Sequence, residues 1–280
     1  MMNEAENPGS IYVYAVIIHR GASRFAIGHR GASRFAEDPI AYGAIGLDGA
    51  PVYALTLDDE GAGALAALVS RIDRPRVRPE RRNLSAHHAV LQRALAEKGV
   101  LPMTFGLIAE SEQAARELLR RNHATLREQL DRVAGHSEMG LRVQWSVPNV
   151  FEYFVNLRGE LRAARDALGD KSRADRGALL ALGQRFERAL QDERARHTSR
   201  VEEALQKQDL QVLRGPLRAE HEVMNLACLV PRARPDLFER AVNEVAADFD
   251  DHFAFAINGP WAPHSFVTLN LSAADPPPSR

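Results

Sequence analysis

Residues 11–18 read IYVYAVII and lie near the start of a chain of 280 residues. β-Branched and aromatic side chains fill this run, which has the length of a strand and predicts a buried one. A second strand is predicted at residues 52–57. Residues 64–72 (ALAALVSRI) fit either a strand or a helix, because the alanines favour a helix whereas the run is short and lies between glycine and proline signals.

The rest of the first half alternates helical and extended patterns. Asn83 is a predicted N-cap, and apolar or histidine side chains follow it at helical spacing until Gly99. Further elements are a strand at residues 100–107, a helix capped by Ser111 and an alternating strand at residues 138–147. This order is that of a split βαβ unit, so we expect residues 1–147 to form a ferredoxin-like α/β sandwich.

The second half begins with helices and then becomes strand-like. We expect a helix at residues 150–168 and a long helix at residues 177–208, whose polar stretch 192–200 should project into solvent. Strands, one helix and a possible last strand at residues 265–271 should complete a C-terminal α/β domain with long helices, residues 148–272. Residues 273–280 form a proline-rich tail. The predicted class is therefore α+β with two domains.

Composition limits the classes of partner. The chain has 36 basic and 37 acidic residues, and its net charge of −1 gives no electrostatic reason to bind nucleic acid or an anionic membrane. A single cysteine, Cys228, precludes an intrachain disulfide and favours a reducing, cytoplasmic location. No secretory signal pattern and no apolar run of the roughly 20 residues needed to cross a bilayer occurs.

Catalytic motifs are absent from the sequence. It contains no phosphate-binding loop, no nucleophile elbow and no zinc-binding helix motif. His87 and His88 are adjacent on a predicted helix and point about 100° apart, so they are poorly placed to chelate one metal, and one of them should pack inside. Cys228 lies in an apolar strand, where a thiol is usually inert. We therefore expect no enzyme activity, no cofactor and no metal site.

Two basic features leave an interaction role open. Arg76, Arg78, Arg81 and Arg82 form either a solvated connector with salt bridges or a docking surface for an acidic partner segment. The octapeptide HRGASRFA occurs at residues 19–26 and again at 29–36. It is either a tandem duplication in a surface loop, where insertions cost little, or a basic arm that binds a partner.

Several segments together resemble the gas-vesicle F/L protein family. The segments are IYVYAVI (11–17), LAALVSRI (65–72), RPERRNLSAHHAVLQRAL (78–95), VLPMTFG (100–106), EMGLRVQW (138–145) and GPWAPHSF (259–266). They occur in the family's order and spacing along nearly the whole chain. In the family, the segment that corresponds to LAALVSRI is a strand. The duplicated octapeptide departs from the pattern, since family members usually have a variable loop there.

The resemblance implies a ferredoxin-like N-terminal domain, a second α/β domain with long helices and no enzyme activity. It also implies a cytoplasmic protein of the gas vesicle that assists vesicle assembly and contacts the small, hydrophobic principal shell protein and other accessory proteins. We hypothesise that the N-terminal domain supplies the contact surface, with these candidate residues: Arg78, Arg81, Arg82, Asn83, His87 and Phe105. The alternatives are a ferredoxin-like small-ligand regulator or enzyme with an unrecognised site, and, less favoured by the charge, a nucleic-acid-binding sheet.

Overall fold

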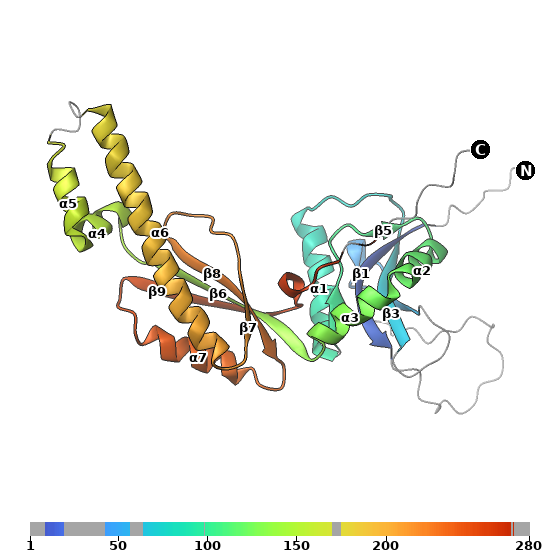
Figure 1. The fold of residues 1–280 in the computed structure, drawn as a ribbon. Coiled ribbons are helices and arrows are strands. Elements are labelled where there is room, and N and C mark those ends of the chain that lie inside the picture. Colours follow the sequence, from blue (N-terminus) through green and yellow to red (C-terminus); the bar gives the residue numbers. More distant parts are fainter. Residues whose placement is uncertain are drawn as a thin grey trace, which may run out of the picture. The chain divides into compact units, whose positions relative to one another are not determined.

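The computed structural model describes residues 9–19, 43–56, 64–97, 99–169, 175–269 and 271, and it contains two compact units (Figure 1). The first unit comprises Met1–Ser137 with Trp261–Arg280, and the second comprises Glu138–Pro260. This division differs from the expected domains at 1–147 and 148–272, because the chain returns to the first unit after residue 260. Ala262, for example, joins the hydrophobic cluster of the first unit. Residues 20–36 of the duplicated segment and the tail at 273–280 lie outside the described residues.

The first unit is built on a five-stranded sheet in the order β2-β3-β1-β4, with β5 paired to β1 beside that path. All of these pairs are antiparallel. The strands are β1 (Ser10–His19), β2 (Tyr53–Thr56), β3 (Ala64–Ile72), β4 (Val100–Pro102) and β5 (Ile108–Ala109). Residues 64–72 thus form a strand, as the family resemblance favoured.

Helices account for the burial of β1. The unit contains α1 (Arg81–Glu97), α2 (Glu112–Arg121) and α3 (His123–Val133). Tyr12 shares a cluster with Val90 and Leu91 of α1, while α2 and α3 also contact β1. Ile11 and Val13 alternate with Tyr12 along the strand and are equally buried. The prediction of a buried strand at residues 11–18 is therefore confirmed for residues 11–17, which are at most 1% exposed.

The second unit is built on a four-stranded sheet in the order β7-β8-β6-β9. Its strands are β6 (His136–Trp145), β7 (Gln211–Arg214), β8 (Glu222–Pro231) and β9 (Phe253–Trp261). Its helices are α4 (Val150–Leu157), α5 (Gly159–Asp166), α6 (Arg176–Gln206) and α7 (Asp236–Ala246). Helices together with two antiparallel sheets confirm the predicted α+β class.

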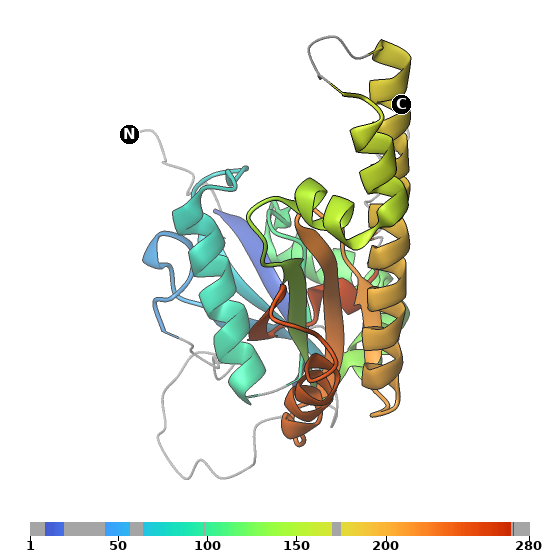
Figure 2. The ribbon, with the colours of Figure 1, turned by 90° about the vertical axis from the view of Figure 1, so that its left-hand side faces the viewer.

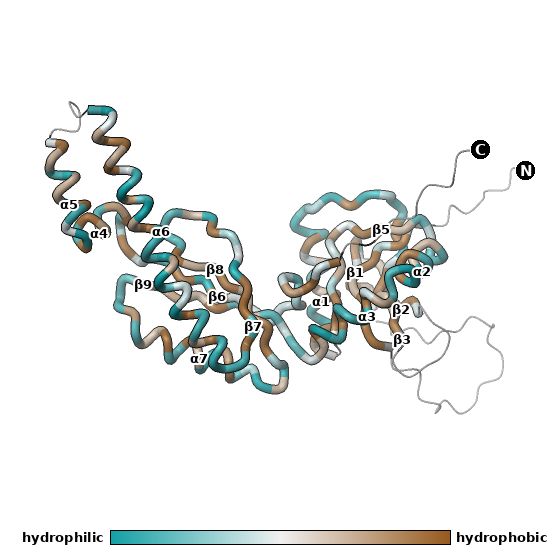
Figure 3. The backbone as a smooth tube through the Cα atoms, in the orientation of Figure 1, coloured by the Kyte–Doolittle hydropathy of each residue, from teal (hydrophilic) through white to brown (hydrophobic). Residues whose placement is uncertain are grey.

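The helix α6 dominates this unit. It has 31 residues, which corresponds to roughly 46 Å of α-helix. Its N-terminal part lies beside α4 and α5, and its C-terminal part lies along the sheet, where Val201 and Leu205 are buried (Figure 2). Hydrophobic and hydrophilic residues alternate along α6, as expected for a helix with one face packed (Figure 3).

The polar stretch 192–200 projects into solvent only in part: Asp192, Arg196 and Arg200 are exposed, whereas other side chains turn inward. Glu193 and His197 are only 7% and 8% exposed. Arg158 Nη2 lies 2.5 Å from Glu193 Oε1, Arg196 also pairs with Glu193, and the His197 ring contacts the ring of Phe249. Charge pairing makes this burial tolerable, because a buried carboxylate with hydrogen-bonded guanidinium partners avoids the penalty of an isolated charge.

Two predicted helix boundaries were also wrong. Asn83 does not cap α1, which begins at Arg81; instead its side-chain amide donates to the carbonyl of Arg78 at 2.9 Å, and its side chain is buried. The helix predicted at 150–168 is interrupted at Arg158, whose backbone is extended and whose side chain reaches Glu193. In both cases the polar side chain, Asn83 or Arg158, bonds to a residue outside its own helix, and the helical spacing of the sequence does not reveal such a contact.

Two predicted strands are shorter or absent. The strand expected at 100–107 ends at Pro102, and the chain then turns through Gly106, whose φ of +91° favours glycine. The possible strand at 265–271 is replaced, just after Pro263, by the short 3-10 helix η2 (His264–Phe266). The ferredoxin-like description of the first unit stays a prediction, since the connection from β1 to β2 includes residues outside the described ones.

Replacing Glu193 with Gln should lower the free energy of unfolding by about 2 kcal/mol at pH 7, because Arg158 and Arg196 lose a buried charged acceptor. Burial raises the pKa of Glu193, but hydrogen bonds from Arg196 and Arg158 outweigh burial and hold the pKa below its ordinary value of 4.5. The stabilisation that ionised Glu193 gives to the folded state is therefore complete above pH 4.5, and it is lost as the pH falls through the lower pKa of the folded state. Urea unfolding of both proteins at decreasing pH should show the difference shrinking, and a constant difference would contradict the ion cluster.

Candidate functional site

An open groove of about 760 Å³ lies on the first unit. It is formed by the N-terminal half of α1, the turn after β4 and the short helix η2. Its lining residues are Arg81, Leu84, Ser85, His87, His88, Thr104, Phe105 and His264. Three segments distant in sequence therefore meet at one surface.

The bottom of the groove is a hydrogen-bonded aromatic cluster. Tyr12 Oη lies 3.0 Å from His87 Nδ1 and accepts a hydrogen bond from the backbone N–H of Gly106 at 3.0 Å. The Phe105 ring lies 5.5 Å from the His87 ring, centroid to centroid. The sequence prediction that one of the two adjacent histidines packs inside is confirmed for His87.

Two histidines of the groove, His87 and His264, favour the neutral form. Burial, followed by the nearby His264 and His88, lowers the pKa of His87 to about 4. Burial also lowers the pKa of His264. The imidazole of His88 packs against Trp261 with ring centroids 4.8 Å apart. The groove therefore carries no charge from His87 at neutral pH.

The rim of the groove combines an apolar and a basic side chain. Leu84 is 44% exposed, and Arg81 is exposed beside it. Arg82 pairs with Glu80 at 3.1 Å, but within the described part of the chain neither Arg78 nor Arg81 has an acidic partner. An exposed leucine next to the unpaired guanidinium group of Arg81 is suited to a segment that carries both apolar and acidic side chains.

The structure brings some of the predicted site residues together and separates others. Arg81, His87 and Phe105 line the groove, as one surface. Asn83 is buried beneath it and holds the carbonyl of Arg78, so it supports α1 instead of facing a partner. Arg78 and Arg82 are exposed on the connector and the first turn of α1 without lining the groove.

Sequence reasoning missed one wall of the groove. His264 comes from the segment GPWAPHSF, which carried the family resemblance but was not placed near residues 81–88. No local pattern predicts this neighbourhood, because it depends on the chain returning to the first unit after β9. Leu84, Ser85, His88 and Thr104 were also missed as lining residues, although Leu84 and His88 were recognised as part of the helix.

The described residues give little support for a metal site or a reactive thiol. No group of three or more His, Cys, Asp or Glu side chains in the described ranges is arranged to hold a metal ion. Cys228 is fully buried in β8, and burial raises its thiol pKa to about 12, as its apolar setting predicted. Of the helices in the described ranges, none is both long and apolar enough to cross a membrane.

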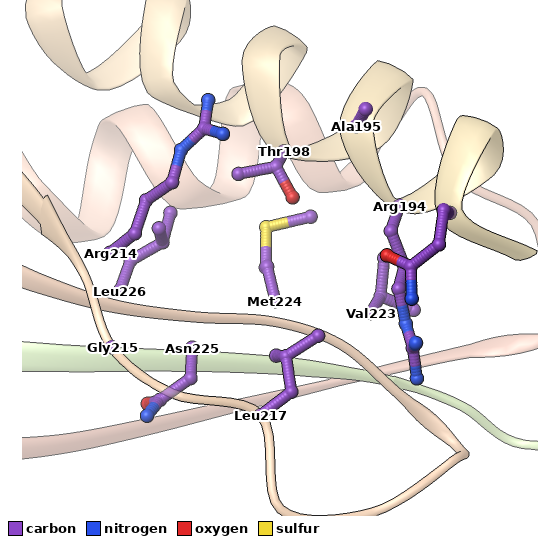
Figure 4. A pocket seen from close by; sticks show the side chains of 11 residues that line it. Arg194, Ala195, Thr198, Arg214, Gly215, Leu217, Val223, Met224, Asn225 and Leu226 are labelled. Carbon is purple, nitrogen blue, oxygen red and sulfur yellow. The ribbon is translucent and has the colours of Figure 1, made fainter.

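A second pocket, of about 190 Å³, lies in the second unit between α6 and strands β7 and β8. Figure 4 shows Met224 pointing toward Thr198 of α6, with Arg194 and Arg214 on either side. Both arginines have partners: Arg194 donates to the carbonyl of Glu220 at 2.7 Å, and Arg214 pairs with Glu202. Because these charges serve the fold, the groove of the first unit is the stronger candidate site.

Comparisons with known proteins agree along the chain. The family model described as gas vesicle synthesis protein GvpL/GvpF matches residues 10–268. The chain belongs to the GvpL/GvpF family. Gas vesicle protein F of Streptomyces sp. (strain CB03234) is 34% identical over 234 residues, covering 82% of this chain and 93% of that protein. Gas vesicle protein F of Nostoc sp. (strain PCC 7120 / SAG 25.82 / UTEX 2576) is 24% identical, covering 80% and 91%.

Solved GvpF structures share the fold. The crystal structure of GvpF from Anabaena sp. PCC7120 has a TM-score of 0.74 at 21% identity and covers 94% of this chain and 99% of that one. GvpF from Microcystis aeruginosa gives a TM-score of 0.70 at 19% identity, covering 93% and 99%. The family resemblance drawn from the sequence motifs is thus confirmed, and the mixed α/β architecture is that of GvpL/GvpF family members.

The neutral His87 predicts a pH dependence of stability. An unfolded histidine takes up a proton near pH 6.5, whereas folded His87 does so only near pH 4, so the unfolded state gains stability between these values. The wild-type chain should therefore lose about 3 kcal/mol more than a His87→Phe variant as the pH falls from 6.5 to 4. Urea unfolding at several pH values measures this difference. Parallel pH profiles for the two proteins would show that His87 is not held neutral by burial.

Proposed function

We propose that this chain is a cytoplasmic accessory or minor structural protein of the gas vesicle, which binds the principal shell protein and assists vesicle assembly without catalysing a reaction. Membership of the GvpL/GvpF family supports the vesicle role, because the matching model describes a gas vesicle synthesis protein. Its relatives named gas vesicle protein F support association with the vesicle. Other gas vesicle accessory proteins are further partners in this proposal.

The groove of the first unit is the proposed contact surface for the shell protein. A shell subunit with large apolar surfaces must be shielded from self-association before it is assembled. The groove offers Leu84 and Phe105 as apolar contacts and Arg81 as a charged one. A segment that places an apolar side chain on Leu84 and a carboxylate near Arg81 would satisfy both. The observation that carries this proposal is the exposed Leu84 beside Arg81, which has no acidic partner within the described ranges.

A non-catalytic role is consistent with the chemistry of the groove. His87 is buried and hydrogen-bonded to Tyr12, so it is held in place by the fold. No carboxylate, cysteine or lysine lines the groove beside the histidines. Ser85 and Thr104 bring hydroxyl groups to the groove, but among the described residues neither hydroxyl is hydrogen-bonded to a histidine, so the pairing of nucleophile and base that covalent catalysis uses is not formed there.

The role in assembly is tested by deleting the chain in a host that forms gas vesicles and examining the cells by electron microscopy. We expect vesicles to be lost or malformed, and complementation with the wild-type chain should restore them. Normal vesicles in the deletion strain would refute an essential role in assembly.

The contact surface is tested by reversing two charges in the full chain. The double variant Arg78→Glu/Arg81→Glu should retain about a tenth or less of the shell-protein binding seen with wild type, because each repelled carboxylate costs on the order of 1 kcal/mol. Full chains are needed because a fragment ending at residue 147 would lack His264 of the groove. Binding is measured by pull-down of the purified principal shell protein.

The matched control is Arg188→Glu, an exposed arginine on α6 of the second unit. It changes the net charge in the same direction without touching the groove. Equal loss of binding in this control, or unchanged binding in the double variant, would place the contact elsewhere.

A further inference from the structure

The two edges of the second sheet differ in how they are protected. At one edge, β7 has four residues, ends at Arg214, which pairs with Glu202, and is followed by Gly215 and Pro216. At the other edge, β9 has nine residues, FAFAINGPW, and none of them is charged. Short length, charge and proline are the devices that prevent edge strands from pairing with other chains. β7 is short and charged and is followed closely by a proline, whereas β9 has only Pro260 near its end.

The backbone register shows which groups of β9 point outward. The N–H of Ser146 donates to the carbonyl of His252 at 2.7 Å, and farther along the strands the side chain of Asn258 lies over Gly140. The two contacts have the same register, so β6 and β9 run antiparallel without a bulge between them. In an antiparallel pair the hydrogen-bonding groups of successive residues face opposite sides. Even-numbered residues of β9 therefore face β6, and the backbone groups of Phe255 and Ile257 face away from it.

No strand among the described residues pairs with this outer side of β9. Figure 1 shows β9 at the margin of the second unit's sheet. The side chain of Ile257 is 43% exposed, although Phe255 on the same face of the sheet packs against the hydrophobic cluster. A charge-free strand with outward-facing donors and acceptors is a template for one more strand.

We propose that β9 pairs with β9 of a second copy of this chain, antiparallel and about a twofold axis that passes beside Ala256. In this register Phe255 lies opposite Ile257 of the other copy and exchanges both backbone hydrogen bonds with it. The twofold axis repeats this pair, so the same patch serves both copies. The two four-stranded sheets become one continuous sheet.

The strand's own sequence selects a second copy as the occupant. Antiparallel self-pairing places large apolar side chains opposite each other at Phe255 and Ile257, and alanine opposite alanine at the axis. Such cross-strand apolar pairs stabilise a sheet, whereas opposed like charges would destabilise it, and here there are none. The net charge of −1 per chain adds little repulsion between copies. One pair of strands buries less area than a permanent dimer needs, so association should depend on concentration.

Single cysteines test the register directly in the full chain. In the proposed dimer the two Ala256 residues form a non-hydrogen-bonded pair with Cα atoms about 4.5 Å apart, which suits a disulfide. Ala254 is the matched control on the same face of β9, because each copy's Ala254 lies opposite Asn258 of the other. The two Ala254 Cα atoms are then about 14 Å apart along the strand, too far for a disulfide. The native thiol of Cys228 is buried and should not react.

Under mild oxidation, Ala256→Cys should form a covalent dimer, while Ala254→Cys and wild type stay largely monomeric on non-reducing gels. Sedimentation equilibrium of the wild type should show the average mass rising toward that of a dimer as concentration increases. Ile257→Lys should abolish this rise, whereas Leu213→Lys at a similarly exposed position of β7 should not. Unchanged urea midpoints for the lysine variants confirm that both fold.

Three results would overturn the proposal. The first is a wild-type chain that stays monomeric at the highest concentration tested. The second is equal cross-linking of the Ala254 and Ala256 cysteine variants, which would indicate random collision. The third is a dimer that persists in Ile257→Lys. None of these readouts involves the groove of the first unit, so the result is independent of shell-protein binding.

Discussion

Tyr12 and Tyr14 carry their hydroxyl groups into the interior of the first unit, where both side chains are completely buried. A buried hydroxyl without a partner costs free energy, so each must be bonded by the surrounding elements. Tyr12 contacts His87 of α1 and the backbone of Gly106, while Tyr14 donates to Ser70 of β3 and accepts from the backbone N–H of Leu47. Two side chains of one strand thereby fix α1, the neighbouring strand β3, the short 3-10 helix η1 (Leu47–Gly49) and the turn at Gly106.

The groove follows from this arrangement. Because Gly106 donates to Tyr12, the turn after β4 is held next to α1, and Phe105 is brought beside the His87 ring. A similar constraint acts around Tyr14, where a Cβ atom at Gly46 would lie 2.7 Å from the hydroxyl oxygen. Only glycine allows the chain to pass so close to Tyr14. The proposed contact surface thus rests on a hydrogen-bonded and packed floor, and the exposed side chains at its rim are Leu84 and Arg81.

Local patterns were sufficient for some elements and not for others. The strand at 11–18 was predictable from its continuous run of β-branched and aromatic side chains, and the helix after Asn83 from side chains that recur at helical spacing. The first turn of α1 was not, because Asn83 bonds to the carbonyl of Arg78 instead of capping the helix. The burial of Glu193 within the polar stretch 192–200 could not be foreseen either, since it depends on Arg158, 35 positions earlier. His264 reached the groove by the same kind of long-range contact.

The two units repeat one strand order, and the repeat explains where an open edge remains. In each unit the second strand pairs with the third, the third with the first, and the first with the fourth, which leaves the fourth strand at an edge. In the first unit that strand is β4, which has only three residues and ends at Pro102, so it offers little to a further strand. In the second unit the corresponding strand is β9, whose nine residues include none with a charge. The topology is the same in both units, but the outer edge of the fourth strand is protected in the first unit and unprotected in the second. The difference therefore lies in the length and composition of this strand. The outer side of β9 is accordingly the part of the described sheets where pairing with another chain meets the least resistance.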